Sequence, residues 1–118
     1  MSTFTVSVEV GDVLGLSFER VEALVDTGAS YARVPRPLLQ RLGIVPQERR
    51  SFRIADESVV EYDVGQAPLR IDGLTLYSRV VFGDPDSQPL LGAVTLEDFG
   101  LGVDPIAQRL VPVTRLLM

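Results

Sequence analysis

An apolar segment ends in the tripeptide Asp26-Thr27-Gly28, and this junction constrains the fold of the chain more than any other feature. Residues 21–25 finish in Leu24-Val25, as a strand does when it becomes buried on both faces. Glycine in the tripeptide permits a sharp turn and a close backbone approach. A strand that leads into such a turn places one carboxylate at the end of a rigid element. We interpret this junction as one half of an active site.

The residue types that are missing narrow the chemistry available to that acid. The 118 residues include no Cys and no His, and the sequence also lacks Lys and Asn, so all 11 basic side chains are Arg. This excludes Ser-His and Cys-His nucleophile pairs, a Schiff-base or phosphate-loop lysine, and zinc sites built on imidazole or thiolate. Carboxylates, hydroxyl groups and arginine remain. We therefore expect neither a metal ion nor a cofactor.

Length, charge and hydrophobicity indicate one soluble domain over residues 1–118. With 46% hydrophobic residues the chain can bury a sizeable core, and no apolar run approaches the ~20 residues that span a bilayer. The first residues carry no visible secretion signal. A net charge of −5 argues against nucleic-acid binding, and the cluster of Arg49, Arg50 and Arg53 is typical of a solvated strand face. We expect a cytoplasmic protein that binds neither nucleic acid nor membranes.

Alternation of apolar and polar residues predicts a mostly β domain. Strands are expected at residues 3–10, 14–25, 51–55, 58–71 and 74–82. The last three should form an antiparallel meander, with hairpin turns at Asp56-Glu57 and Asp72-Gly73. Gly65 interrupts the longest of these strands and predicts a β-bulge.

Two short helices and three further strands complete the expected elements. The first helix covers residues 38–42 after a proline-rich start and ends at Gly43, and the second covers residues 94–99 and ends at Gly100. A brief buried strand at residues 90–92 precedes the second helix. Residues 101–104 and 109–117 are expected as closing strands. The apolar end, residues 114–118, suits burial in a partner's sheet and packing within the same monomer equally well.

Two separated segments carry a resemblance to a known family. The run Leu24-Val25-Asp26-Thr27-Gly28-Ala29, together with the later Pro89-Leu90-Leu91-Gly92 and its following helix, resembles the retroviral-type (retropepsin-like) aspartic proteases. The resemblance extends over most of the chain and includes a hairpin, residues 52–62, where those proteins place a substrate-covering flap. It implies an all-β fold: a closed, antiparallel, β-barrel-like acid protease monomer with one or two short helices.

The resemblance also implies roles for individual residues. Asp26 would be the catalytic residue, and Thr27, Gly28 and Ala29 would form the active-site loop, with Thr27 linking the loops of two subunits. The residues expected to bind substrate are Ser30, Ile54, Ala55, Asp56, Glu57, Leu91 and Gly92. The chain departs from the retroviral pattern at Ser30 and Ala93, where those proteases commonly carry an Asp-Arg ion pair, and in a flap tip without glycine.

Amide hydrolysis by an aspartic enzyme needs two carboxylates that share one proton. The ionised member removes a proton from water, and the protonated member polarises the scissile carbonyl. Only one Asp-Thr-Gly occurs in the chain. The second carboxylate must therefore be Asp26 of another copy, placed across a two-fold axis. We expect a homodimeric aspartic endopeptidase that acts on polypeptides.

The sequence is also compatible with two other functions. The chain could be a non-catalytic peptide-binding or regulatory module on the same fold, or a carboxylate-dependent hydrolase that acts on something other than peptides. Other acidic groups favour structural interpretations. Glu97-Asp98 is typical of a solvated helix surface rather than a glycosidase pair, because neighbours in a helix point in different directions. The loop at residues 84–87 lacks the number and spacing of calcium ligands.

Overall fold

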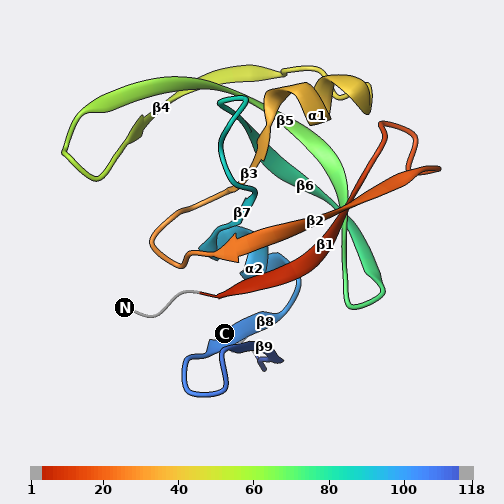
Figure 1. The fold of residues 1–118 in the computed structure, drawn as a ribbon, viewed down its shortest axis with the longest axis vertical. Coiled ribbons are helices and arrows are strands. Elements are labelled where there is room, and N and C mark those ends of the chain that lie inside the picture. Colours follow the sequence, from red (N-terminus) through yellow and green to blue (C-terminus); the bar gives the residue numbers. More distant parts are fainter. Residues whose placement is uncertain (1–3, 115–118) are drawn as a thin grey trace.

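The computed structural model describes residues 4–114 and folds them mainly into β-strands, with two short helices (Figure 1). Its strands are β1 (Thr5–Gly11), β2 (Phe18–Val25), β3 (Ala32–Pro35), β4 (Glu48–Arg53), β5 (Val59–Ile71), β6 (Leu74–Gly83), β7 (Leu90–Leu91), β8 (Leu101–Asp104) and β9 (Arg109–Pro112). The two helices in the described range are α1 (Arg36–Arg41) and α2 (Ala93–Asp98).

Six strands form a hydrogen-bonded ring in the order β1, β2, β7, β3, β6 and β5. The pairing of Glu9 with Arg70 and of Val10 with Leu69 links β5 back to β1, while β4 is attached to β5 outside the ring. The predicted all-β class with two short helices is confirmed. The β2–β7 and β3–β6 pairs are parallel, however, so the ring is mixed rather than wholly antiparallel. Long crossovers through α1 and the β4–β5 hairpin permit these parallel pairs.

Strands β4, β5 and β6 form the predicted antiparallel meander. Asp72 and Gly73 both have positive φ angles, 50° and 84°, as a tight hairpin turn requires. The prediction of a bulge at Gly65 is wrong, because the β5–β6 register continues through the pair Gly65 and Val80. Space explains this glycine instead, since a Cβ atom there would lie 2.8 Å from the carbonyl oxygen of Val45.

Both predicted helices form and end at the expected glycines. A proline lies in the first turn of α1, where the missing N–H costs nothing, and Gly43 after its end has a φ of 77°. Gly100 after α2 has a φ of 67°. Helix α1 buries Leu38 and Leu39 against the rest of the core. The short helices are therefore stabilised by one buried face each rather than by their own length.

The hydrophobic core fills the inside of the ring and extends under both helices. Its largest fully buried side chains include Phe82, Leu39, Leu69 and Leu91. Burial of a side chain of this size stabilises a fold by about 2 kcal/mol. The core gives β2, β3 and β7 a rigid base. Strand β2 leads into the Asp26 turn, β3 follows it, and β7 pairs with both strands.

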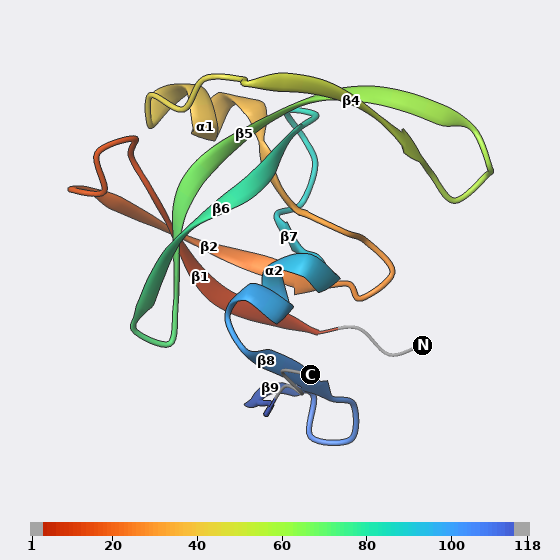
Figure 2. The ribbon, with the colours of Figure 1, turned by 180° about the vertical axis from the view of Figure 1, so that it is seen from behind.

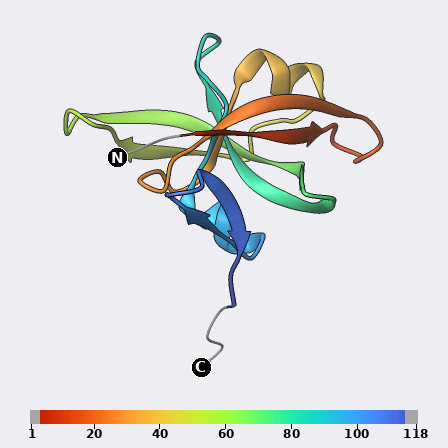
Figure 3. The same cartoon turned by 60° about the horizontal axis from the view of Figure 1, so that its bottom comes forward.

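Strands β8 and β9 pair only with each other and stand apart from the ring (Figure 3). Helix α2, which contacts β8, lies between this hairpin and the ring (Figure 2). The closing strand at residues 101–104 is confirmed, whereas the second one ends at Pro112 instead of continuing through Thr114. Residues 1–3 and 115–118 lie outside the described residues, and with them the expected strand start at Thr3 and most of the apolar end.

Candidate active site

Strand β2 carries Asp26 to the point where it leaves the sheet. β2 runs parallel to β7 here, with Val25 opposite Leu91. The backbone N–H of Asp26 donates to the carbonyl oxygen of Leu91 at 3.0 Å, so the pairing extends to the acid itself. Both Val25 and Leu91 are buried in the core. The aspartate therefore stands at the end of a strand that is fixed by packing as well as by hydrogen bonds.

The turn after Asp26 orients its carboxylate. The N–H of Gly28 donates to Asp26 Oδ1 at 2.9 Å, and the N–H of Ala29 donates to the Asp26 carbonyl oxygen at 3.1 Å. A Cβ atom on Gly28 would lie 3.2 Å from the same Oδ1, so glycine gives this turn room to close around the carboxylate. The Asp26 side chain is partly exposed. The turn presents one oriented carboxylate at an accessible surface.

The start of helix α2 holds the next part of the loop from behind. The N–H of Ala93 donates to the carbonyl of Ala29 at 2.8 Å, and that of Val94 donates to the carbonyl of Ser30 at 2.9 Å. Gly92 makes this approach possible. A Cβ atom there would lie 2.5 Å from the carbonyl oxygen of Ser30 and 2.7 Å from that of Tyr31. Backbone atoms cannot rotate away, so this position tolerates no side chain without movement of the loop.

A buried hydroxyl group completes the support of the loop. Thr95, which is 1% exposed, accepts a hydrogen bond on Oγ1 from the N–H of Ala32 at 3.1 Å. Ala32 is the first residue of β3, the strand that follows the loop. The loop is therefore fixed at its start by β7, in its middle by the first residues of α2, and at its end by Thr95.

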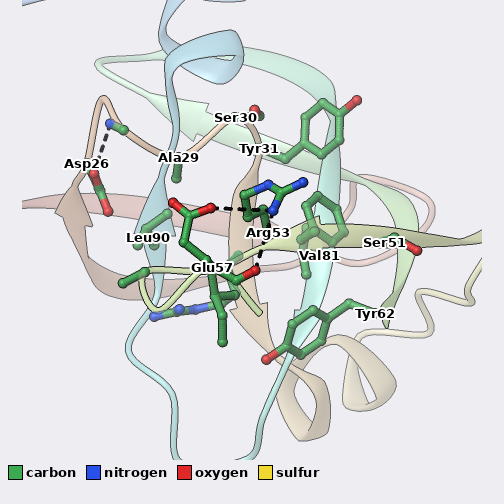
Figure 4. A pocket seen from close by; sticks show the side chains of 15 residues that line it. Asp26, Ala29, Ser30, Tyr31, Ser51, Arg53, Glu57, Tyr62, Val81 and Leu90 are labelled. Carbon is green, nitrogen blue, oxygen red and sulfur yellow. Dashed lines mark hydrogen bonds and ion pairs between the residues drawn. The ribbon is translucent and has the colours of Figure 1, made fainter. Parts of the chain in front are cut away.

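Asp26 lies on the wall of an open cavity of about 820 Å³ (Figure 4). The cavity is formed by the loop that follows β2, by β3, by the β4–β5 hairpin, and by the ends of β6 and β7. The lining residues are Asp26, Gly28, Ala29, Ser30, Tyr31, Arg33, Ser51, Phe52, Arg53, Ile54, Ala55, Glu57, Tyr62, Val81 and Leu90. Glu57 is the other carboxylate among them, and Arg53 contacts it at 3.4 Å.

The β4–β5 hairpin closes in a compact turn at its tip. Ile54 N–H donates to the carbonyl of Ser58 at 3.0 Å, and Glu57 N–H donates to the carbonyl of Ile54 at 2.9 Å. Glu57 has a φ of 71°, a conformation that glycine adopts more readily. Ser58 donates from Oγ and from N–H to the Asp56 carboxylate, which lowers the pKa of Asp56. The turn predicted at Asp56-Glu57 is confirmed.

Aromatic side chains connect the hairpin with the loop. Tyr31 and Phe52 meet edge to face with ring centres 6.1 Å apart, and Tyr62 lies 6.3 Å beyond Phe52. Arg50 and Arg79 donate to the Tyr31 hydroxyl oxygen at 2.5 and 3.2 Å. Such contacts between rings contribute about 1 kcal/mol each beyond the buried area. They give the hairpin a defined position at its base.

Seven of the residues predicted for the site line the cavity: Asp26, Gly28, Ala29, Ser30, Ile54, Ala55 and Glu57. Thr27 and Asp56 are exposed but do not line it. Leu91 is 2% exposed and belongs to the core, and Gly92 is buried behind the loop. These last two support the loop, whereas Leu90, next to Leu91, lines the cavity. The binding roles assigned by resemblance stay predictions.

Several lining residues were not predicted from the sequence, among them Tyr31, Arg33, Tyr62, Val81 and Leu90. Alternation along β6, and along β3 with the residue before it, could have shown that residues 79 and 81, or 31 and 33, share a face. It could not have shown which face meets the cavity. That choice depends on the pairing of β3 with both β6 and β7.

Within residues 4–114, no three acidic side chains converge where they could hold a metal ion together. Neither helix within residues 4–114 is long and apolar enough to cross a membrane. The cavity offers the oriented carboxylate of Asp26, the Glu57 carboxylate in contact with Arg53, and a second arginine, Arg33. Aromatic and aliphatic side chains form most of the rest of its walls.

The sequence model described as "Aspartyl protease" matches residues 6–95 of this chain. Comparison with curated protein sequences gives no match. Among solved structures, the simian foamy virus protease superposes with a TM-score of 0.58 at 17% identity, covering 81% of this chain and 94% of its own. The EIAV protease in complex with an inhibitor also has a TM-score of 0.58, at 20% identity, and covers 84% of this chain and 89% of its own.

A retropepsin-like aspartic protease from Rickettsia conorii superposes with a TM-score of 0.55 at 21% identity, covering 87% of this chain and 88% of its own. At such identities the likeness concerns the fold. The fold is retropepsin-like, and the resemblance inferred from residues 24–29 and 89–92 is confirmed.

Proposed function

The chain belongs to the aspartyl protease family, and from this premise we propose that it is a homodimeric aspartic endopeptidase. Asp26 of each subunit supplies one of the two catalytic carboxylates, and polypeptides are the substrate. The β4–β5 hairpin acts as the flap that covers the bound peptide. The active-site loop comprises Thr27, Gly28 and Ala29.

One observation carries this proposal: a single oriented carboxylate faces a cavity in which the remaining acid already has a partner. Gly28 orients Asp26 through its N–H, while Glu57 contacts Arg53. A lone aspartate cannot act as acid and base in the same step. A second copy of the same turn, related by a two-fold axis, would provide the missing carboxylate without a further motif.

The chemistry then follows from two like charges placed close together. The two carboxylates cannot both be ionised at the same time, so the pair holds one proton. The ionised group accepts a proton from water, which attacks the scissile carbonyl carbon. The protonated group donates to the carbonyl oxygen. Neither a metal ion nor a covalent intermediate takes part, in agreement with the residue types that the sequence supplies.

Replacement of the aspartate tests the proposal. We expect the wild-type protein to cleave a fluorogenic peptide library, and Asp26→Asn to lower kcat by about 100-fold or more, because general acid and base catalysis are both lost. Asp98→Asn is the matched control, since Asp98 is exposed on α2 and does not line the cavity. It should leave cleavage unchanged. Light scattering should show a dimer under the conditions of cleavage.

Mixing the two proteins tests whether the site is shared between subunits. If each active site needs two Asp26 side chains, a tenfold excess of Asp26→Asn should trap wild-type chains in inactive mixed dimers. The activity per wild-type chain should then fall by about tenfold. Activity that is independent of the added variant would contradict a shared site.

A second candidate is a non-catalytic peptide-binding module on the same fold. The hairpin tip favours it, since Glu57 has a positive φ angle where glycine would turn more easily, and the Arg53 contact braces the same turn. For this function, wild-type protein and Asp26→Asn should bind peptides equally well and cleave none. Turnover of a non-peptide ester or amide that depends on Asp26 would instead favour a different hydrolase.

A further inference from the structure

Arg33 is one of the side chains that line the cavity. It lies on β3, where it pairs with Val81 of β6 on one side and with Leu90 of β7 on the other. Side chains of directly paired residues point to the same face of a sheet. Val81 and Leu90 both line the cavity, as Arg33 does. The arginine therefore stands between two apolar side chains that also line the proposed peptide site.

The Arg33 side chain is held in a defined position. Its Nε and Nη2 donate to the carbonyl oxygen of Gln88 at 3.3 and 2.8 Å. Its stem runs along Gly83, where a Cβ atom would lie 2.8 Å from Cγ and 3.1 Å from Cδ of Arg33. Gly83 thus leaves a slot that the arginine stem fills. A side chain fixed at both stem and head loses little entropy when it binds a ligand.

The charge of Arg33 has no acidic partner among residues 4–114. Arg53, the other cation of the cavity, contacts Glu57, whereas Arg33 donates to a backbone carbonyl. A guanidinium group has five N–H donors, and the Gln88 carbonyl uses two of them on one edge. The end of the guanidinium, with Nη1 and the second proton of Nη2, remains available. That end can form two parallel hydrogen bonds with a carboxylate.

We propose that Arg33 binds an acidic side chain of the substrate, so that the protein cleaves peptides that carry Glu or Asp near the scissile bond. This inference rests on the proposed function and specifies its substrate class. Discrimination should be strong. A site built to pair with a charged group is left with an unpaired partner when a neutral analogue binds.

Matched peptide pairs test the proposal. Each pair contains Glu or Gln at one position near the scissile bond, and the pairs scan the positions on both sides. For wild type we expect a ratio of kcat/KM, Glu over Gln, of at least about tenfold at one position. Arg33→Gln should reduce this ratio to about one while the Gln peptide is still cleaved. Arg33→Glu should cleave a peptide with Lys at that position faster than the Glu peptide. Such an inversion would not result from a simple loss of folding.

Arg53→Gln is the matched control, because it removes a cation that lines the same cavity but already has an internal partner. It should preserve the Glu over Gln ratio. Arg33→Lys keeps the charge but loses the two-pronged geometry, so it should give an intermediate ratio. A preference that survives in Arg33→Gln, or that disappears in Arg53→Gln alone, would overturn the assignment to Arg33.

Failure of this inference differs from failure of the proposed function. Cleavage of peptides with no preference for acidic residues would overturn the role of Arg33 and leave the protease proposal intact. If no peptide is cleaved, the same Glu and Gln peptides should be tested as ligands by calorimetry. Tighter binding of the Glu peptide that is lost in Arg33→Gln would support the arginine site without catalysis. Equal binding of both peptides would refute it.

Discussion

Replacement of Gly92 by alanine should damage the active-site loop more than its size suggests. The backbone of Gly92, with φ −97° and ψ 176°, suits alanine well, so conformational strain is not the reason. Space is the reason. The new methyl group would lie 2.5 Å from the carbonyl oxygen and 2.6 Å from the carbonyl carbon of Ser30, and 2.7 Å from the carbonyl oxygen of Tyr31.

The size of the effect follows from the movement that these contacts demand. Non-bonded heavy atoms pack best at about 3.5 Å, so the loop must move by roughly 1 Å. Overpacking of this kind costs about 1–3 kcal/mol. The same movement weakens the hydrogen bonds from Ala93 to Ala29 and from Val94 to Ser30, each worth about 1 kcal/mol. We expect the free energy of unfolding to fall by about 3 kcal/mol.

Catalysis should suffer in addition to stability. The loop that would move carries Asp26, and a misplacement of about 1 Å can cost roughly 100-fold in rate. Urea denaturation followed by circular dichroism measures the first effect, at one fixed protein concentration because a dimer's stability depends on it. Peptide cleavage well below the unfolding midpoint measures the second.

Gly100→Ala is the control at the other end of the same helix. Gly100 has a φ of 67°, and a Cβ atom there would meet nothing within 4 Å. Alanine should therefore cost only about 1 kcal/mol through its backbone conformation, and cleavage should stay intact. If Gly92→Ala is no more destabilising than Gly100→Ala, the close approach of the loop to Gly92 does not constrain the site.

Two further substitutions test the support and the charges around the site. Thr95→Val leaves the buried N–H of Ala32 without its acceptor, so the free energy of unfolding measured by urea denaturation should fall by about 1–3 kcal/mol. Thr95→Ser keeps the acceptor and should lower the free energy of unfolding less. Equal stability of Thr95→Val and wild type would contradict the role of this hydrogen bond. Asp63 forms ion pairs with Arg36, whose Nη2 lies 2.6 Å from Oδ2, and with Arg49. Hydrogen bonds from these two arginines lower the pKa of Asp63 in the folded state. The stabilisation of the fold by ionised Asp63 is present above the unfolded pKa of about 4 and is lost as the pH falls through the folded pKa. Asp63→Asn should therefore flatten the acid limb of a curve of unfolding free energy against pH. Acid limbs that run parallel in the variant and the wild type would contradict this role of Asp63.

The features predicted correctly from the sequence depend on a few neighbouring residues. Asp72-Gly73 folds into a hairpin turn because both residues accept positive φ angles, and Gly43 and Gly100 end helices for the same local reason. The junction at Asp26 also belongs to this class. The strand before it and the Gly28 turn after it lie within five residues, so the pattern contains most of the information.

The features that escaped sequence reasoning depend on contacts between distant segments. Leu90 and Leu91 illustrate this most directly. Alternation requires that one of them faces the core and the other the opposite side, but it gives no choice between them. The choice follows from the pairing of Leu24 with Leu90 and Val25 with Leu91, which puts Leu91 in the core. Gly65 was misjudged for the same reason, because the carbonyl of Val45 that restricts it comes from another segment.

The two proposals differ in how they depend on the association of chains, and this separates them physically. A shared proton between two Asp26 carboxylates exists only in a dimer, so turnover should rise more steeply than linearly with protein concentration while dimers form. Arg33, by contrast, is positioned by Gln88 and Gly83 of its own chain. Binding of the Glu peptide in preference to the Gln peptide should therefore persist at dilutions where the chain is monomeric and cleavage has stopped. A binding preference that disappears together with the dimer would mean that the partner subunit, rather than the chain's own β3, sets the position of the guanidinium.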